Sequence, residues 1–189
     1  MPSALPPKMA LSIPDGSNTL VANQIRWAGM KVQLDGEELS RQDKVGLIAD
    51  YMRSLDAELT VRVCWMNEGY GNCGRCEKCS RTIAALLAEG IDPRRAGFPV
   101  EAGTLERIRE QLPAWLSYGA LRVEYWDEIR RRSIENDARI RDEDRPFFRW
   151  LRDLKLSAYN KRRSFRQTVL DLIPHPLFLY LKKLLHAAN

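Results

Sequence analysis

The chain has 189 residues, of which 44% are hydrophobic and 29% charged, and its formal net charge is +5. This composition predicts a soluble domain with a substantial apolar core. No apolar run approaches the ~20 residues that cross a bilayer, and Met9–Ile13 is too short for a secretory signal and follows three prolines. We therefore expect a cytoplasmic protein.

The first third of the chain predicts short elements separated by turns. Residues 1–18 include four prolines and predict an irregular N-terminal segment. Asn18–Trp27 predicts a short helix, and the alternation over Met30–Leu34 predicts a strand closed by a turn at Asp35-Gly36.

A longer helix is predicted to begin after Ser40, which can cap it, with Asp43 in the first turn. The apolar face of this helix would consist of Val45, Leu47, Ile48, Tyr51, Met52 and Leu55. The segment Leu59–Cys64 predicts a second strand.

All four cysteines of the chain fall in one stretch, CWMNEGYGNCGRCEKC, with the spacing C-x8-C-x2-C-x2-C; they are Cys64, Cys73, Cys76 and Cys79. Two-residue gaps let neighbouring thiolates turn toward a common centre, and the glycines of the stretch allow the chain to bend around an ion. Four thiolates suit a tetrahedral Zn2+, and a closed shell of protein ligands predicts a structural site.

Two alternatives to zinc remain. An iron–sulfur cluster is one, because C-x2-C-x2-C also opens the ferredoxin pattern, although Ser80 and Arg81 follow here instead of a cysteine and a proline. Redox-active thiols are the other, whereas disulfides would need an oxidising compartment. In a zinc site the net charge of −2 would be offset by backbone N–H groups and by Arg75, Lys78 and Arg81.

Beyond the cysteines the pattern is helical. Thr82–Leu87 predicts a buried helix that stops at Gly90. Thr104 is predicted to cap a helix that ends before Pro113. Two further helices are marked by the residues Leu121, Tyr125, Trp126 and Ile129, and by Asp144, Pro146, Phe147, Phe148, Trp150, Leu151 and Leu154. The last two helices are predicted over Arg162–Leu172 and Leu177–Leu185.

Basic charge is concentrated at the C-terminus. Residues 145–189 contain ten Lys or Arg against two acids, a net +8, whereas residues 1–144 carry 20 minus 23, or −3. This tail predicts an ordinary helical pack, an anionic membrane contact through Leu177–Leu185, or nucleic acid binding through Lys161-Arg162-Arg163. Arg130–Arg132 predicts a solvated face, and no catalytic role is predicted for His175 or His186.

The run Cys64–Arg81, with its CGRCEKC core, resembles the zinc motif of 7-cyano-7-deazaguanine synthases and related PP-loop ATP pyrophosphatases. Those proteins are ATP-dependent ligases of the adenine nucleotide alpha-hydrolase-like superfamily. The upstream segment Val32–Ala49 is similar to the strand, loop and helix start that precede the zinc cysteines in that family. The resemblance covers residues 30–90, about a third of the chain, and the fuller CGRCEKC form is similar to little-characterised members associated with surface polysaccharide genes.

The resemblance implies a Rossmann-like PP-loop fold, and it implies that Ser40, Arg41 and Lys44 face a nucleotide or substrate cleft. A helix cap and two solvated charges are the simpler interpretation of these three residues. The family's Ser-Gly-Gly-x-Asp-Ser loop is absent, since no two of the 11 glycines are adjacent. No other phosphate-binding glycine loop occurs either. The chain therefore resembles the C-terminal half of such a ligase, and ATP would be bound only with the missing N-terminal half.

These observations predict a mixed α/β, mostly helical chain: an irregular segment over 1–18, a zinc-bearing α/β segment over 19–100, and a helical basic region over 101–189. The predicted function is the zinc-binding portion of a PP-loop ATP-dependent ligase-like protein, with a PP-loop half or protein as partner. The alternative is a non-enzymatic, zinc-stabilised binding module that docks on an anionic membrane, a nucleic acid or a protein. No catalytic residue is predicted.

Overall fold

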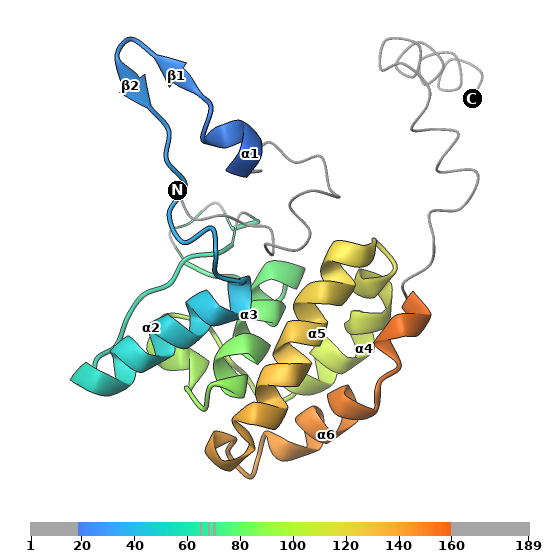
Figure 1. The fold of residues 1–189 in the computed structure, drawn as a ribbon. Helices are drawn as coiled ribbons and strands as arrows, with labels where there is room; N and C mark the ends of the chain where they lie inside the picture. Colours follow the sequence, from blue (N-terminus) through green and yellow to red (C-terminus); the bar gives the residue numbers. More distant parts are fainter. Residues whose placement is uncertain (1–18, 65, 68, 70, 160–189) are drawn as a thin grey trace.

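The computed structural model describes residues 19–159, apart from positions 65, 68 and 70. In this part of the chain the protein is mostly helical, with one antiparallel sheet of two short strands (Figure 1). The elements are α1 (Thr19–Ala22), β1 (Arg26–Trp27), β2 (Met30–Lys31), α2 (Arg41–Leu55), α3 (Glu77–Ala88), the 3-10 helix η2 (Pro93–Ala96), α4 (Thr104–Leu116), α5 (Ala120–Glu135), η3 (Asp137–Arg139), α6 (Arg145–Asp153) and η4 (Leu156–Tyr159). The described residues contain no parallel sheet, so the Rossmann-like part of the fold stays a prediction.

Helix α3 is the most deeply buried element of the helical body. It packs against α2, α5 and η2, and every residue from Cys79 to Ala88 is buried. The predicted buried helix over Thr82–Leu87 is thus confirmed. Gly90 follows it with φ +74°, and a Cβ at this position would lie 2.6 Å from the carbonyl oxygen of Arg139. Only glycine fits there, which explains why the helix ends at this point.

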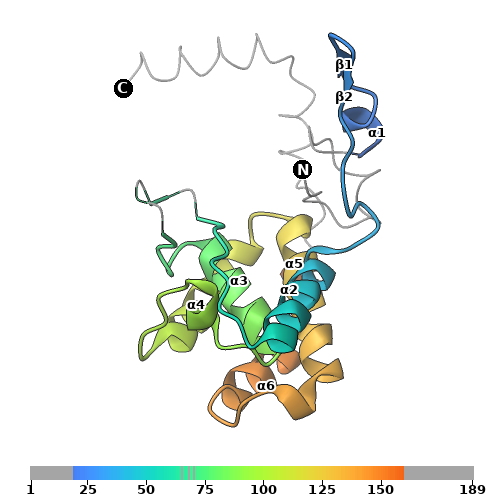
Figure 2. The same cartoon turned by 90° about the vertical axis from the view of Figure 1, so that its left-hand side faces the viewer.

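Helix α5 joins the rest of the body, because it packs against α2, α3, α4 and α6 (Figures 1 and 2). Its Trp126 is fully buried, together with Met52 from α2, Ile83 from α3 and Phe148 from α6. The predicted start of α6 at Asp144 is confirmed, with a proline in the first turn of the helix.

The prediction for α2 is confirmed at its start but only partly along its length. The Ser40 hydroxyl accepts the backbone N–H of Asp43, whose carboxylate accepts the Ser40 N–H, so the two residues form a capping box. Of the predicted apolar face, Val45 and Met52 are buried and Ile48 partly buried, whereas three members are more than half exposed: Leu47, Tyr51 and Leu55. The helix buries one narrow stripe because α3 and α5 contact it from one side.

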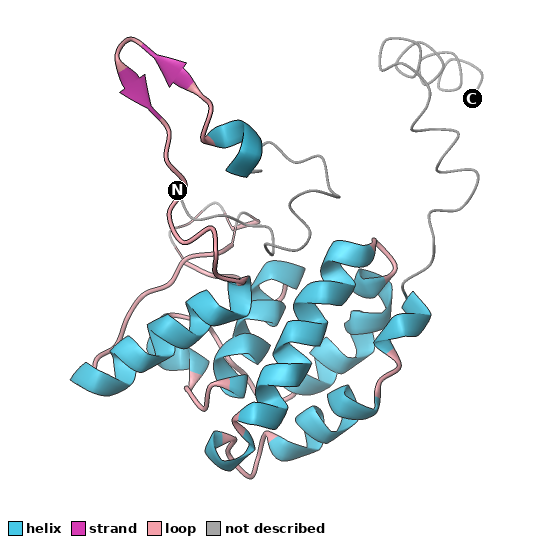
Figure 3. Ribbon diagram, viewed as in Figure 1, coloured by secondary structure: helices cyan, strands magenta, loops and turns pink. Residues whose placement is uncertain are grey.

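The predicted strand over Met30–Leu34 is shorter than expected, and the one predicted over Leu59–Cys64 is not formed. Met30–Lys31 pairs only with Arg26–Trp27, in a hairpin that extends beyond the helical body (Figure 3). Its turn residues Ala28 and Gly29 both have positive φ, as in the type I′ turn that is common in two-residue hairpins. Because Arg26 and Trp27 belong to this hairpin, the helix predicted over 18–27 is shorter than expected and ends at Ala22. Residues 59–64 run as an extended segment that belongs to no sheet. The N–H groups of Leu59 and Val61 donate to the carbonyl oxygens of Arg95 and Ala96, which lie in the 3-10 helix η2 rather than in a strand.

Helix α4 also corrects the sequence-based prediction. It runs through Pro113 to Leu116, because Leu112 and Leu116 are both fully buried and hold the last turn in place despite the missing N–H. Thr104 is the first helical residue rather than the cap, a position that Gly103 takes. Its hydroxyl accepts the N–H of Glu101 at 3.0 Å.

The predicted solvated arginine face is wrong for one of its three members. Arg132 reaches from α5 to Asp43 on α2 at 2.5 Å and lies 3.6 Å from the buried Glu89 carboxylate. Glu89 is 2% exposed and also accepts hydrogen bonds from Gln42 and Asn136. Arg132 therefore belongs to a partly buried polar junction between α2, the end of α3 and α5.

Several predictions lie outside the described residues. These are the irregular segment 1–18, the helices over Arg162–Leu172 and Leu177–Leu185, the two histidines, and the tail's membrane and nucleic acid contacts. In the described part of the chain, no helix has the length and apolar character that a membrane span requires.

Candidate metal centre

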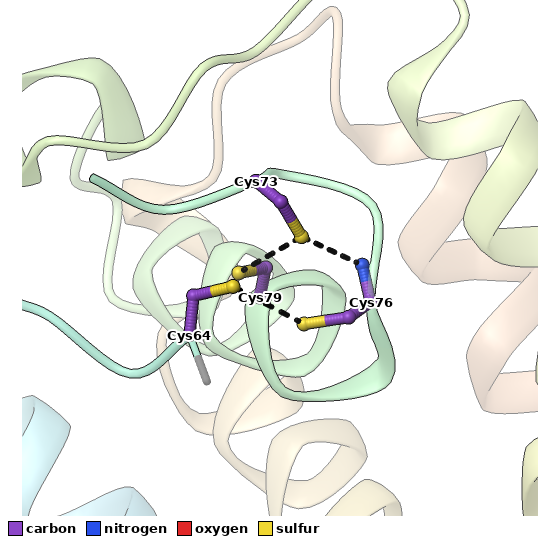
Figure 4. A group of neighbouring side chains, drawn as sticks. All are labelled: Cys64, Cys73, Cys76 and Cys79. Carbon is purple, nitrogen blue, oxygen red and sulfur yellow. Dashed lines mark hydrogen bonds between the residues drawn. The ribbon is translucent and has the colours of Figure 1, made fainter. Parts of the chain in front are cut away.

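The four cysteines reach one point from three successive pieces of the chain (Figure 4). Cys64 ends the extended segment, Cys73 and Cys76 belong to the loop that follows, and Cys79 lies in the first turn of α3. Cys76 is the N-cap of that helix, with φ −71° and ψ 161°. The N–H groups at the start of the helix therefore lie next to the sulfurs, where they favour negative charge, and that of Cys79 forms a hydrogen bond with the Cys76 thiol.

The size of the cluster fits a single tetrahedral ion. All four Sγ atoms lie within 4.8 Å of one another, with 4.0 Å between Cys64 and Cys76 and 3.9 Å between Cys73 and Cys79. Zinc–sulfur bonds of about 2.3 Å at tetrahedral angles place the sulfurs about 3.8 Å apart. A multi-iron cluster has iron and sulfide atoms between the cysteine sulfurs, so it needs them farther apart. No disulfide links the four cysteines.

The loop turns at Gly74, between the second and third ligands. The backbone N–H groups of Arg75 and Cys76 point at the Cys73 sulfur, at 3.5 and 3.3 Å. Donors in this position stabilise a thiolate. Gly74 has φ +68°, and its carbonyl oxygen accepts a hydrogen bond from the Arg107 guanidinium of α4 at 3.0 Å.

The Asn72 side chain, which sequence reasoning missed, joins the first ligand to the rest of the fold. Its Oδ1 accepts the backbone N–H groups of Val63 and Cys64, at 3.1 and 3.3 Å. Its Nδ2 donates to the carbonyl oxygens of Val61 and Gly97, at 2.7 and 3.1 Å. The amide thus replaces the neighbouring strand that the extended segment lacks. Nothing in the sequence marks this residue, since its partners lie up to 25 positions away.

We expect Asn72→Asp to destabilise the chain by about 2 kcal/mol or more, because it removes the donor from the partly buried carbonyl oxygens of Val61 and Gly97 and places a carboxylate against them. Urea melts of the metal-loaded protein measure this loss. The matched control is Asn67→Asp in the same loop, where the exposed side chain donates one long hydrogen bond, to the Gly71 carbonyl oxygen at 3.4 Å, and where a carboxylate can still accept the Gly69 N–H. Equal stability of the two variants would show that the Asn72 amide does not hold Cys64 in place.

Two of the three cations predicted to offset the charge of the centre are engaged elsewhere. Arg75 forms an exposed ion pair with Glu101 at 3.6 Å. Arg81 is 5% exposed, pairs with Glu77 at 3.3 Å, and lies with its guanidinium carbon 4.2 Å from the centroid of the Tyr125 ring. The donors next to the sulfurs are therefore backbone N–H groups of the loop and of the α3 N-terminus.

The thiols differ in acidity. Burial raises the pKa of both Cys76 and Cys79. Burial also opposes ionisation of Cys64, but hydrogen bonds from the backbone and side chain of Cys73 and from the backbone N–H groups of Met66 and Asn67 lower its pKa to about 6. Because a metal ion binds thiolates, binding at neutral pH displaces protons from at least Cys76 and Cys79. The affinity for metal therefore rises with pH.

A second feature lies beside the metal centre, between α2, the extended segment and α3. It is a groove of about 450 Å³ with a mostly apolar lining, which we call the α2 groove; Val45, Leu47, Ile48, Val61, Val63 and Leu86 contribute to it. Of the three residues that the resemblance placed at a nucleotide or substrate cleft, Arg41 and Lys44 line this groove. Ser40 does not line it and serves as the helix cap.

No family model, curated protein or solved structure matches the chain. The resemblance to PP-loop enzymes therefore rests on the cysteine spacing and the upstream segment alone, and a functional assignment has to be built from the metal centre and the α2 groove.

Proposed function

We propose that this chain is a non-catalytic zinc module, in which Zn2+ held by Cys64, Cys73, Cys76 and Cys79 fixes the extended segment to α3. The observation that carries the proposal is the size of the sulfur cluster, which matches one ZnS4 tetrahedron. Four thiolates fill every position of that tetrahedron. No position is left for a water molecule or a substrate, so the ion has a structural role.

We propose further that the module is the zinc-bearing C-terminal part of a PP-loop ATP-dependent ligase-like protein whose ATP-binding loop lies outside these 189 residues. Support comes from the resemblance over residues 30–90 and from the absence of a phosphate-binding glycine loop in the sequence. Arg41 and Lys44, at the apolar α2 groove, give the module a surface on which such a partner can complete a site. Four reduced thiols fit a cytoplasmic location.

The rival function is a zinc-stabilised binding module without any ligase activity. Exposed apolar side chains on α2, Leu47, Tyr51 and Leu55, favour a protein as its partner. The two functions differ in whether the partner carries a Ser-Gly-Gly-x-Asp-Ser loop.

ATP separates these possibilities. Calorimetric titration of the chain alone with Mg2+-ATP is expected to show a Kd weaker than about 1 mM, which corresponds to a binding free energy of at most about 4 kcal/mol. An assay for pyrophosphate is expected to detect no release by the chain alone. A complex purified from the source cells is expected to contain a PP-loop polypeptide and to release pyrophosphate from ATP. Tight Mg2+-dependent binding by the chain alone would make it an autonomous enzyme, and a partner without the loop would favour the binding module.

A further inference from the structure

A cavity of about 250 Å³ lies between η3 and α6, and it shares no lining residue with the metal centre or the α2 groove. Three arginines of α6 line it: Arg145, Arg149 and Arg152. Their spacing of four and three residues places them on one face of the helix. Asp137 of η3 is the only carboxylate among the described residues of the lining, which therefore carries a net charge of +2.

Two of these arginines are held in place by Asp137. Nη1 of Arg145 and Nη2 of Arg152 lie 3.1 and 2.7 Å from its two carboxylate oxygens. The Nε of Arg152 also donates to the Ser133 hydroxyl at 3.3 Å. Hydrogen bonds from Arg152 and Arg145 hold the pKa of the Asp137 carboxyl below its usual value, so this carboxylate keeps its charge at neutral pH. A ligand that binds between the two guanidinium groups does not have to order them first.

The cavity keeps donors that the protein does not use. Arg149 is exposed and forms no hydrogen bond or ion pair with another described residue. Each guanidinium has five N–H donors, and neither Nη2 of Arg145 nor Nη1 of Arg152 is bonded within the described chain. The Nε of Arg145 donates to Asp142, whose fully exposed carboxylate is outside the lining and is screened by solvent.

The positive charge of the lining favours an anion. Arg145 and Arg149 are like charges four residues apart on one helix, an arrangement that destabilises the helix unless an anion lies between them. The planar fork of a guanidinium matches the oxygens of a phosphate group in pairs of hydrogen bonds. A phosphomonoester has three such oxygens and a charge of about −1.5 to −2 at neutral pH, which balances the lining.

The shape of the cavity favours a small ligand with a terminal phosphate. Ile140 and Phe148 line it and are only 3% and 1% exposed, so one wall belongs to the core. A phosphodiester continues on both sides of its phosphate, whereas a monoester can enter end-on from the solvent side. The volume is also below the roughly 300–1,000 Å³ of pockets that enclose a drug-sized molecule.

We propose that the cavity between η3 and α6 binds the phosphate group of a small phosphomonoester. Arg149 and the unused Nη groups of Arg145 and Arg152 donate to the phosphate oxygens, and Asp137 positions the latter two arginines. The proposal depends neither on zinc nor on the ligase-like function, because the cavity has no residue in common with the metal centre or the α2 groove.

Nuclear magnetic resonance of the arginine Nε–H groups tests the proposal in the full-length, zinc-loaded chain. Glycerol 3-phosphate, added at constant ionic strength and neutral pH, is expected to shift the signals of the three α6 arginines in a saturable way, with a Kd of about 1–10 mM. Arg149→Gln is expected to weaken binding at least fivefold. The matched control Arg131→Gln removes the same charge from a half-exposed arginine of α5, and it is expected to change the Kd less than twofold.

Four outcomes would overturn the assignment. Shifts no larger than those caused by chloride at equal ionic strength would leave the cavity without a phosphate site. Equal weakening in Arg149→Gln and Arg131→Gln would show a response to overall charge. Dimethyl phosphate binding as tightly as glycerol 3-phosphate would make the site one for diesters, as in nucleic acid. A phosphoserine peptide binding at least tenfold more tightly would give the site to a phosphorylated protein. The amide shifts of α6 report whether each variant is folded.

Discussion

Cys76→Ser is expected to release the bound metal and to abolish cooperative melting of the region around α3. Cys76 is both a ligand of the proposed zinc ion and the N-cap of α3, so its loss breaks the link between the loop and the most buried helix. Structural zinc contributes about 10–16 kcal/mol in small zinc-binding peptides, as much as the entire stability of a typical domain. Metal analysis and thermal melts followed by circular dichroism measure both effects.

The parent protein is expected to contain about one zinc per chain, and Arg75→Ala is the matched control. Arg75 is adjacent to Cys76, but its side chain is 70% exposed and forms only a weak surface ion pair. This variant is expected to keep its metal and to melt within about 0.5 kcal/mol of the parent. Brown protein with iron and acid-labile sulfide would overturn the zinc assignment, and a zinc-replete Cys76→Ser variant would remove Cys76 from the ligand set.

Gly74→Ala is expected to destabilise the metal-loaded chain by about 3 kcal/mol or more and to lower its affinity for zinc. Its φ of +68° costs a residue with a Cβ about 1 kcal/mol or more. The added Cβ would also lie 2.6 Å from the carbonyl oxygen of Pro99 and 2.9 Å from the Cγ of the same residue. Backbone on both sides of this contact is fixed, so the turn between Cys73 and Cys76 has to open. Denaturant melts and competition with a chelator of known zinc affinity measure the two losses.

The same substitution at Gly71 provides the control for Gly74→Ala. A Cβ at Gly71 would meet only the side-chain nitrogen of Asn67, at 3.9 Å, and its φ lies outside the left-handed region. Gly71→Ala is expected to change stability by less than about 1 kcal/mol, in either direction. If both variants lost zinc equally, general stiffness of the loop rather than the Gly74 turn would govern the site.

Local chemistry explains why some elements were predictable. Ser40 and Asp43 cap α2 as expected, because both halves of a capping box lie within four residues. The start of α6 at Asp144 is a similar case, since a proline in the first turn is preorganised for the helix. Pro113 misled the prediction because the burial of Leu112 and Leu116, decided by distant partners, outweighs one missing hydrogen bond.

The extended segment is a feature that the local sequence pattern did not predict correctly. An apolar run such as Leu59–Cys64 predicts a strand, but a strand needs a neighbour, and its neighbours come from residues 95–97 and from the Asn72 side chain. Arg132 is a second example. A run of three arginines is usually solvated, yet this one meets acids on two other helices.

The sequence by itself predicted the cluster of cysteines, because the spacing of Cys73, Cys76 and Cys79 brings the three thiols together within a single loop and helix start. Only the tertiary structure decided how Cys64 joins them. Its position depends on the Asn72 amide and on contacts with residues more than 20 positions away, and hydrogen bonds of that reach leave no periodic signal in the sequence. Helix α2 could be predicted because its cap and its periodic pattern are local in the sequence. The α2 groove could not be predicted, because it forms only where three segments distant in the sequence pack side by side.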